Sequence, residues 1–303
     1  MKILITGSTG LVGRALVGEL KRAGHTVCRL VRRGTSAEAL RGSEGFDVQW
    51  DPRTGELGAA AVGADAVVNL AGASIAGGRW TTERKKMLHD SRVETTRALV
   101  GALAKMAVRP RVLVSASAIG YYGNRGEEVL TEASQAGDDF LSAVAKEWEL
   151  EGAKGEALGI RVVRARFGVI LAKEGGALSQ MARPFRLGLG GRIGSGKQWM
   201  SWVSLDDVVE VVRMALENGD VRGALNVVAP EPVRNAEFTG ALAKALHRPA
   251  LFPAPAFALR LMLGEMADAL LLSSQRVVPG QLEKLGYKFR NANLTSTLVS
   301  LLS

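Results

Sequence analysis

The sequence predicts an α/β protein built on a doubly wound parallel sheet, with a smaller, mainly helical lobe toward the C-terminus. Short apolar runs alternate with longer amphipathic segments over the first half of the chain. This order is typical of a parallel sheet that is covered by helices on both faces. The first apolar run ends in a glycine-rich turn that leads directly into a helix-like segment. Of the 303 residues, 47% are hydrophobic and 23% are charged, which fits a globular chain with a sizeable core.

The expected strands of the first half are short, mostly apolar runs bounded by polar or turn residues. They are Lys2–Thr6, Thr26–Val31, Asp47–Trp50, Ala66–Leu70, Arg111–Ser115 and Arg161–Arg166. Longer segments with apolar residues at helical spacing lie between these strands. The expected helices include Leu11–Ala23, Thr82–Met106 and Asp139–Leu158.

After Leu171 the regular alternation stops. Residues 173–200 are rich in glycine, so we expect a loop there. A short strand over Met200–Val203 follows. A helix then begins at Asp206 or Asp207, with Asp206 as the expected N-cap.

A last strand is expected over Ala224–Val228, before a helical tail that is punctuated by prolines. This organisation predicts a main domain over residues 1–172, to which residues 200–230 return. The remainder of residues 173–303 is expected to form the smaller, substrate-binding lobe.

Composition excludes several functional classes. The net charge is +9, but the basic residues form short clusters without a long tail or interleaved aromatic residues. We interpret them as a solvated basic surface plus an anion-binding cofactor site, and expect no nucleic-acid partner. The single cysteine, Cys28, permits no intramolecular disulfide, and no metal-binding motif appears. No stretch reaches the ~18 apolar residues of a membrane span. We therefore expect a cytoplasmic protein without a membrane partner, and a homodimer is compatible with the sequence.

A glycine-rich turn of spacing GxxGxxG joins the first expected strand to the first expected helix. Such a turn folds the backbone tightly and brings the N–H groups and dipole of a helix N-terminus to a pyrophosphate. Because it lies between a strand and a helix in a chain of βα units, we interpret it as a dinucleotide-binding loop. The residues assigned to the cofactor here are Gly7, Ser8, Thr9, Gly10, Leu11 and Val12.

The end of the second expected strand indicates which dinucleotide is bound. An acidic residue there would bind the ribose hydroxyls of NAD, whereas a basic residue accommodates the 2′-phosphate of NADP. Val31 is followed by Arg32 and Arg33, and no acid precedes them. Guanidinium groups are suited to phosphate. We therefore expect a Rossmann-type domain that binds NADP(H), with these three residues at the adenosine end.

Seven motifs together resemble the extended short-chain dehydrogenase/reductase superfamily. They are MKILITGSTGLVG, AVVNLAG (66–72), GRWT (78–81), DSRVETT (90–96), SASAIGYYG (115–123), PFRLGLGGRIGSGKQWMSW (184–202) and PAFALRLMLGEMADALLLSSQRVVP (255–279). The last two are typical of one branch, the NADP-dependent nucleoside-diphosphate-sugar epimerase-like proteins, whose substrates are mostly unassigned. The resemblance covers essentially the whole chain and implies a Rossmann domain followed by a substrate lobe.

The resemblance also implies roles for individual residues. It places Leu70, Ala71 and Gly72 against the cofactor, and Arg92 near the cofactor phosphates or ribose. Asp51 is either close to the adenine or the start of an ordinary turn.

Members of the superfamily act through a serine and a YxxxK pair, in which the ammonium favours the phenolate form of the tyrosine. Lys146 matches the lysine and is also assigned to the cofactor ribose, but Ser142 stands where the tyrosine is expected. Ser117 matches the active serine, with Ser115 as the alternative. Tyr121 is the candidate for supplying the missing phenol, and Tyr122 beside it shares that possibility.

The sequence gives fewer indications of the residues that bind the substrate. We assign Trp80, Arg192 and Trp199 to the substrate because they lie in or beside glycine-rich loops, and Arg192 suits an anionic group. The sequence thus predicts an NADP(H)-binding epimerase or oxidoreductase acting on a small substrate, with a nucleotide sugar as one candidate. A catalytically silent NADP(H)-binding sensor or regulator is the alternative, because the usual tyrosine is replaced by Ser142.

Overall fold

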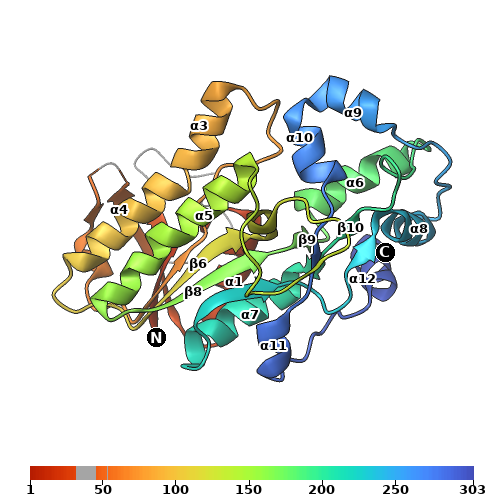
Figure 1. The fold of residues 1–303 in the computed structure, drawn as a ribbon. Coiled ribbons are helices and arrows are strands. Elements are labelled where there is room, and N and C mark those ends of the chain that lie inside the picture. The colour runs from red at the N-terminus through yellow and green to blue at the C-terminus, as the bar shows by residue number, and fades with distance from the viewer. Residues whose placement is uncertain (32–45, 53) are drawn as a thin grey trace.

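The computed structural model describes residues 1–31, 46–52 and 54–303. Its centre is an eight-stranded sheet of order β12-β8-β6-β5-β1-β2-β3-β4 (Figure 1). All neighbouring strands are parallel except β3 and β4. The strands are β1 (Lys2–Thr6), β2 (Thr26–Val31), β3 (Phe46–Asp51), β4 (Glu56–Leu57), β5 (Ala66–Asn69), β6 (Val112–Ala118), β8 (Arg161–Phe167) and β12 (Gly223–Val227). The predicted doubly wound α/β fold is confirmed.

The strand order reverses at β1, which lies between β2 on one side and β5 on the other. Lys2 pairs with Thr26 of β2, and Ile3 pairs with Ala66 of β5. A crevice forms at the carboxyl ends of parallel strands where successive connections leave in opposite directions. The sheet therefore places the residues after β1, β2, β5 and β6 around one edge.

Alternate residues of the strands are buried in two separate cores, one on each face of the sheet. Ile3 and Ile5 pack on one face with α1 (Leu11–Arg22) and α7 (Leu205–Glu217). Leu4, between them, packs on the other face with α4 (Val93–Ala104). Figure 1 shows α4 and α5 (Phe140–Ala153) on the side of the sheet opposite α7. Burial on both faces explains why these strands are almost continuously apolar.

The C-terminal part is mainly helical and adds short strands. Its elements are β9 (Val169–Leu171), α6 (Gly176–Arg186), β10 (Trp199–Met200), β11 (Trp202–Ser204), β13 (Val233–Arg234), α8 (Asn235–Ala245), α9 (Ala256–Leu263), α10 (Glu265–Ala267), η4 (Asp268–Leu272), β14 (Arg276–Val277), α11 (Gly280–Lys284) and α12 (Leu294–Leu302). Earlier in the chain lie η1 (Ala59–Ala61), α3 (Thr82–Asp90), η2 (Ile119–Tyr122), β7 (Val129–Leu130) and η3 (Lys154–Leu158). None of the helices in the described ranges is long and apolar enough to cross a membrane.

The expected loop over residues 173–200 was wrong in part, because α6 occupies Gly176–Arg186. Leu178, Ala182 and Phe185 recur on one helix face and are buried in a core with α8 and α12. The glycines begin the helix instead of preventing it. Sequence reasoning gave more weight to the number of glycines than to the helical spacing of these apolar residues.

The expected helix Thr82–Met106 is divided into α3 and α4 at Ser91 and Arg92. The Ser91 hydroxyl accepts a hydrogen bond from the Ala73 amide at 3.0 Å, and Arg92 donates to the Ala73 carbonyl at 2.9 Å. The two residues at the break between the helices therefore fix the position of the segment that follows β5.

Asp206 was also wrong as the N-cap of α7, because the helix is capped by Ser204, whose hydroxyl accepts from the Asp207 amide at 3.0 Å. Asp206 is exposed, whereas Asp207 is fully buried. The Asp207 carboxylate accepts from the amides of Arg290 and Asn291 at 2.8 and 3.0 Å. It thus fastens the C-terminal segment to α7.

We predict that Asp207→Ala lowers the free energy of unfolding by about 3–5 kcal/mol, because it leaves buried amide and hydroxyl groups without an acceptor. Chemical denaturation followed by circular dichroism measures this change. Asp206→Ala, in the same helical turn but exposed, is the matched control and should change stability by less than about 1 kcal/mol. Equal losses for the two variants would contradict this role of Asp207.

Candidate cofactor and active site

The glycine-rich turn after β1 is closed so tightly that two of its positions require glycine. Gly7 has φ +68°, and a Cβ there would lie 2.5 Å from the carbonyl oxygen of Leu70. A Cβ on Gly13 would collide with the Gly7 carbonyl. The turn therefore crosses directly over the end of β5, and α1 packs directly on the turn.

The N-terminus of α1 at this turn is free for an anion. Gly10 is the N-cap, no side chain caps the helix, and no acid lies in its first turn. The first N–H groups of an α-helix have no intrahelical acceptor, and the helix dipole adds partial positive charge there. Gly10 donates to the Gly7 carbonyl at 3.0 Å, which fixes the turn. A pyrophosphate fits this arrangement.

The chain leaving β5 passes beside a half-buried cation, Arg92. The Arg92 guanidinium donates to the carbonyl oxygens of Ala73 and Leu88, and a Cβ on Gly72 would lie 3.2 Å from its central carbon. Burial, together with the positive charge of Arg84, lowers the pKa of Arg92 to about 10. Arg92 is still charged at neutral pH, so a cation adjoins the Leu70–Gly72 turn.

At the adenosine end, Val31 is buried where β2 ends. Arg32 and Arg33 lie outside the described residues, so their assignment to a 2′-phosphate stays a prediction. Asp51 is the last residue of β3, the strand next to β2.

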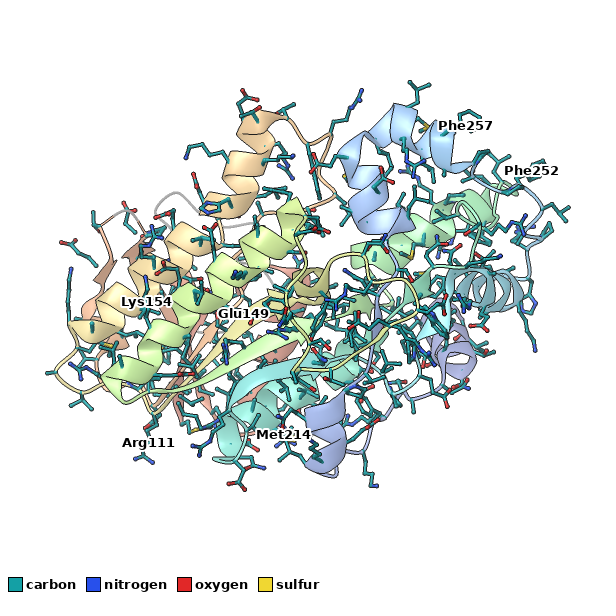
Figure 2. All side chains as sticks on the ribbon, in the orientation of Figure 1. Arg111, Glu149, Lys154, Met214, Phe252 and Phe257 are labelled. Carbon is teal, nitrogen blue, oxygen red and sulfur yellow. The ribbon has the colours of Figure 1, made fainter. Side chains whose placement is uncertain are left out.

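Ser117, near the carboxyl end of β6, is held by a buried carboxylate. Its hydroxyl donates to Oε1 of Glu149 at 2.7 Å, and the serine is 2% exposed. Glu149 lies on the inner face of α5 (Figure 2) and is 5% exposed. Arg166 of β8 donates to both oxygens of Glu149, at 2.7 and 2.8 Å. Ser117 is thus joined to a buried bidentate ion pair.

The hydrogen-bond network of this ion pair extends through Arg166 to Tyr122 and Asn226. Arg166 Nη1 donates to the Tyr122 hydroxyl at 2.9 Å, and that hydroxyl donates to Asn226 Oδ1 at 2.6 Å. Burial would lower the pKa of Arg166, but the hydrogen bonds and charge of Glu149 raise it above its ordinary value. Burial raises the pKa of Tyr122 to about 12. At neutral pH the guanidinium is charged and the Tyr122 phenol is neutral.

The two neighbouring tyrosines have different environments. Tyr122 is fully buried and belongs to the network just described. Tyr121 is half-buried, and the Arg166 guanidinium lies 3.6 Å from the centre of its ring. Tyr121 is therefore the more accessible of the two phenols, as the sequence assignment requires, and its ring covers the ion pair.

Ser142, which the sequence analysis assigned to the tyrosine position, is fully buried. Its hydroxyl lies 3.0 Å from the Gly120 carbonyl and 2.9 Å from Oδ1 of Asp139, the N-cap of α5. A Cβ on Gly137 would lie 2.7 Å from the Ser142 oxygen, so backbone packs closely against this hydroxyl. Lys146, one turn later, is exposed.

The three residues assigned to the substrate lie in two places. Trp80 packs edge-on against Phe140 at the start of α5, with ring centres 5.4 Å apart. Trp199 lies between Arg234 and Arg276, whose guanidiniums are 4.4 and 4.5 Å from its ring. Arg192 is exposed and precedes Ile193.

A small cavity of about 50 Å³ adjoins Trp199. Its wall includes Ile119, two residues after Ser117, together with Met181 and Ile193, and contains no charged side chain. The hydroxyl of Ser273, which also lines it, is buried and has no hydrogen-bond partner in the described structure. A neutral group with one polar atom suits this cavity.

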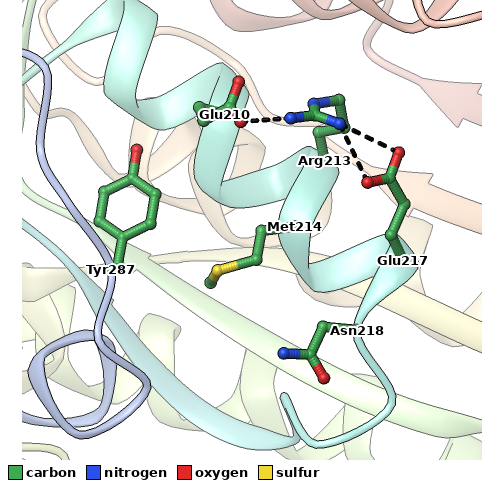
Figure 3. A pocket seen from close by; sticks show the side chains of 6 residues that line it. All are labelled: Glu210, Arg213, Met214, Glu217, Asn218 and Tyr287. Atoms are coloured by element: carbon green, nitrogen blue, oxygen red, sulfur yellow. Dashed lines mark hydrogen bonds and ion pairs between the residues drawn. The ribbon is translucent and has the colours of Figure 1, made fainter.

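A larger cavity of about 300 Å³ lies along α7 and is lined by Glu210, Arg213, Met214, Glu217, Asn218 and Tyr287 (Figure 3). Glu217 pairs at 3.2 Å with His25, which immediately precedes β2. This cavity is therefore at the amino edge of the sheet, away from the glycine-rich turn. Its position excludes it from the cofactor site despite its volume.

Comparison with known proteins agrees with this arrangement of turn and sheet. Residues 3–228 match the NAD dependent epimerase/dehydratase family. The chain belongs to this family. Residues 254–301 match a further domain whose function is unknown, DUF1731.

Relatives match along nearly the whole length of this chain. The "Epimerase family protein Mb2239" of Mycobacterium bovis is 42% identical, over 98% of this chain and 96% of its own. "Epimerase family protein YfhF" of Bacillus subtilis is 40% identical, over 100% and 98%. The crystal structure of "human epimerase family protein SDR39U1 (isoform2) with NADPH" is 34% identical, covers 100% of this chain and 99% of its own, and has a TM-score of 0.89.

Glu149 and Arg166 were missed by sequence reasoning, which assigned neither of them to the site. One signal was present in each case. Arg166 stands next to the last residue of β8 at a buried position, and Glu149 immediately follows Trp148 on the buried face of α5. A charge in such a position needs a partner of opposite sign.

We predict that Arg166→Met lowers the free energy of unfolding by about 3–5 kcal/mol, because it leaves Glu149 as an unpaired buried charge. The double variant Glu149→Leu/Arg166→Met should be less destabilised than the single variant, since it removes both charges. Urea denaturation measures both. Arg22→Met, which breaks an exposed pair with Glu19, is the control. A double variant with the summed loss of both single variants would contradict the pairing.

Proposed function

We propose that this protein is an NADP(H)-dependent oxidoreductase or epimerase-like enzyme of the extended short-chain dehydrogenase/reductase type, acting on a small substrate. One observation carries the proposal: the Gly7 turn crosses over Leu70 and presents the uncapped N-terminus of α1 at the carboxyl edge of the sheet. Family membership supports the same assignment.

The residues present fit a dinucleotide. The backbone of Gly7–Val12 would hold the pyrophosphate, the Leu70–Gly72 turn would adjoin the nucleotide, and Arg92 would supply a cation beside it. The preference for NADP(H) over NAD(H) is supported by Arg32 and Arg33 and by the NADPH in the human relative. When bound, a nicotinamide cofactor supplies hydride transfer.

Ser117, Tyr121 and Lys146 are the groups that we assign to the reaction. A serine hydroxyl has one proton, and that of Ser117 is donated to Glu149. While this bond lasts, Ser117 can accept a hydrogen bond from a substrate but cannot donate one. The Tyr121 hydroxyl is then the candidate donor, and Lys146 supplies positive charge from the exposed side of α5.

The substrate that we propose is small. The uncharged cavity beside Ile119 would take a neutral group, with the free Ser273 hydroxyl as its polar contact. Arg192 precedes cavity-lining Ile193 and is the cation that we assign to an anionic group. Trp80 and Trp199 would flank the substrate from the two sides of the cleft.

A second function, a catalytically silent NADP(H)-binding sensor, is favoured by two specific observations. Ser142, which we assign to the tyrosine position, hydrogen-bonds the Gly120 carbonyl and Asp139 and does not face a substrate, and the proton of Ser117 is already donated to Glu149. Such a protein would bind the cofactor without turning over a substrate.

For the cofactor, we predict that calorimetric titration shows binding of NADPH in preference to NADH. Arg32→Ala/Arg33→Ala should weaken NADPH binding roughly ten- to a hundredfold and leave NADH binding unchanged, because charge-assisted hydrogen bonds to the 2′-phosphate are lost. Arg22→Ala, an exposed arginine on α1, is the control. Equal weakening for both dinucleotides would contradict the assignment to the 2′-phosphate.

For the reaction, NADPH oxidation and NADP+ reduction are followed over a panel of carbonyl compounds, alcohols and nucleotide sugars. We predict turnover that falls at least about a hundredfold in Tyr121→Phe and in Lys146→Met, since general acid–base groups contribute about that much. Lys154→Met, at the end of the same helix, should keep full activity. Tight NADPH binding without turnover across the panel would favour the silent sensor instead.

A further inference from the structure

Large apolar side chains are exposed at one end of the C-terminal part. Fifteen such side chains are exposed in the described ranges, and seven of them come from two short segments. These seven, which we call the outer apolar face, are between 56% and 78% exposed: Leu187, Leu189, Leu251, Phe252, Phe257, Leu261 and Met262. Scattered exposed apolar residues need no explanation, but this concentration does.

The two segments lie against each other. The Phe252 amide donates to the Gly190 carbonyl at 3.0 Å, and the Ala254 amide donates to the Arg192 carbonyl at 2.9 Å. Pro255 then begins α9, a helix of apolar composition in which no residue is buried. Figure 2 shows Phe252 and Phe257 at the same outer end of the molecule, and α9 lies at its edge in Figure 1.

The two sequence stretches that carry this face are basic and contain no acid. The acid nearest to them that pairs with α9 is Asp268, which forms an ion pair with Arg260. No Asp or Glu occurs between Glu174 and Asp206 or between Glu237 and Glu265. The two acid-free stretches carry seven basic residues: Arg183, Arg186, Arg192, Lys197, Lys244, Arg248 and Arg260. Arg183, Arg186 and Arg248 are exposed and have no ion-pair partner in the described part of the chain.

We propose that the outer apolar face docks on an anionic lipid bilayer. Aromatic and aliphatic side chains that project among unpaired arginines suit the boundary between headgroups and acyl chains, where apolar burial and attraction to anionic lipids act together. A second copy of this chain is a poorer fit, because a two-fold contact through this face would bring its arginines close to their own copies. This proposal departs from the expectation of no membrane partner, which rested on the absence of a spanning segment and of a long basic tail in the sequence.

The experiment is co-sedimentation of the full chain with vesicles of phosphatidylcholine alone or mixed with phosphatidylglycerol. Binding is expected to the mixed vesicles, with little to the neutral ones and a decrease as salt is raised. Phe257→Ser/Leu261→Ser should lower partitioning at least about tenfold through lost apolar burial. Arg186→Ala/Arg248→Ala should lower it at least about tenfold through lost attraction to the headgroups.

Val108→Ser is the matched control, because Val108 is 68% exposed but lies in the turn before β6. It should bind as the unaltered protein does. The proposal is overturned if anionic vesicles are not bound, or if the two double variants bind as well as the control. It is also overturned if light scattering shows a dimer that Phe257→Ser/Leu261→Ser dissociates while no variant binds vesicles. Circular dichroism verifies that every variant is folded.

Discussion

The ion pair between Glu149 and Arg166 is the interaction on which the candidate active site depends. It joins α5 to β8, accepts a hydrogen bond from the Ser117 hydroxyl on β6, and reaches Asn226 on β12 through Tyr122. Burying two charges is unfavourable unless both are paired and hydrogen-bonded, and here each is. Because the two buried charges must remain paired, they fix the relative positions of the strand ends where a substrate would react.

The shape of the candidate nucleotide site depends on the close approach of backbone segments. At Gly7 the chain passes so near to Leu70 that a side chain is excluded, and α1 begins immediately afterwards without a cap. These local requirements are visible in the sequence, because a short glycine pattern between a strand and a helix encodes them. The apolar runs of β1 and β2 are local signals as well, and both strands were predicted with their observed bounds.

Other features depend on residues far apart in the chain, and sequence reasoning missed them for that reason. Glu149 and Arg166 are 17 residues apart on different elements. The Asp207 carboxylate is bound by the amides of Arg290 and Asn291, which come from the C-terminal segment. The α6 helix is stabilised by burial against α8 and α12, which the local glycine content does not reveal. The small cavity likewise combines residues from η2, β10 and η4.

The most direct test of the central claim is a crystal structure of this protein with NADPH. The account predicts the pyrophosphate over the N-terminus of α1, the 2′-phosphate beside Arg32 and Arg33, and the nicotinamide on the side of Ser117 and Tyr121. The Glu149–Arg166 pair should be unchanged by the cofactor. A pyrophosphate bound elsewhere, or a nicotinamide directed away from the carboxyl ends of β6 and β8, would contradict it.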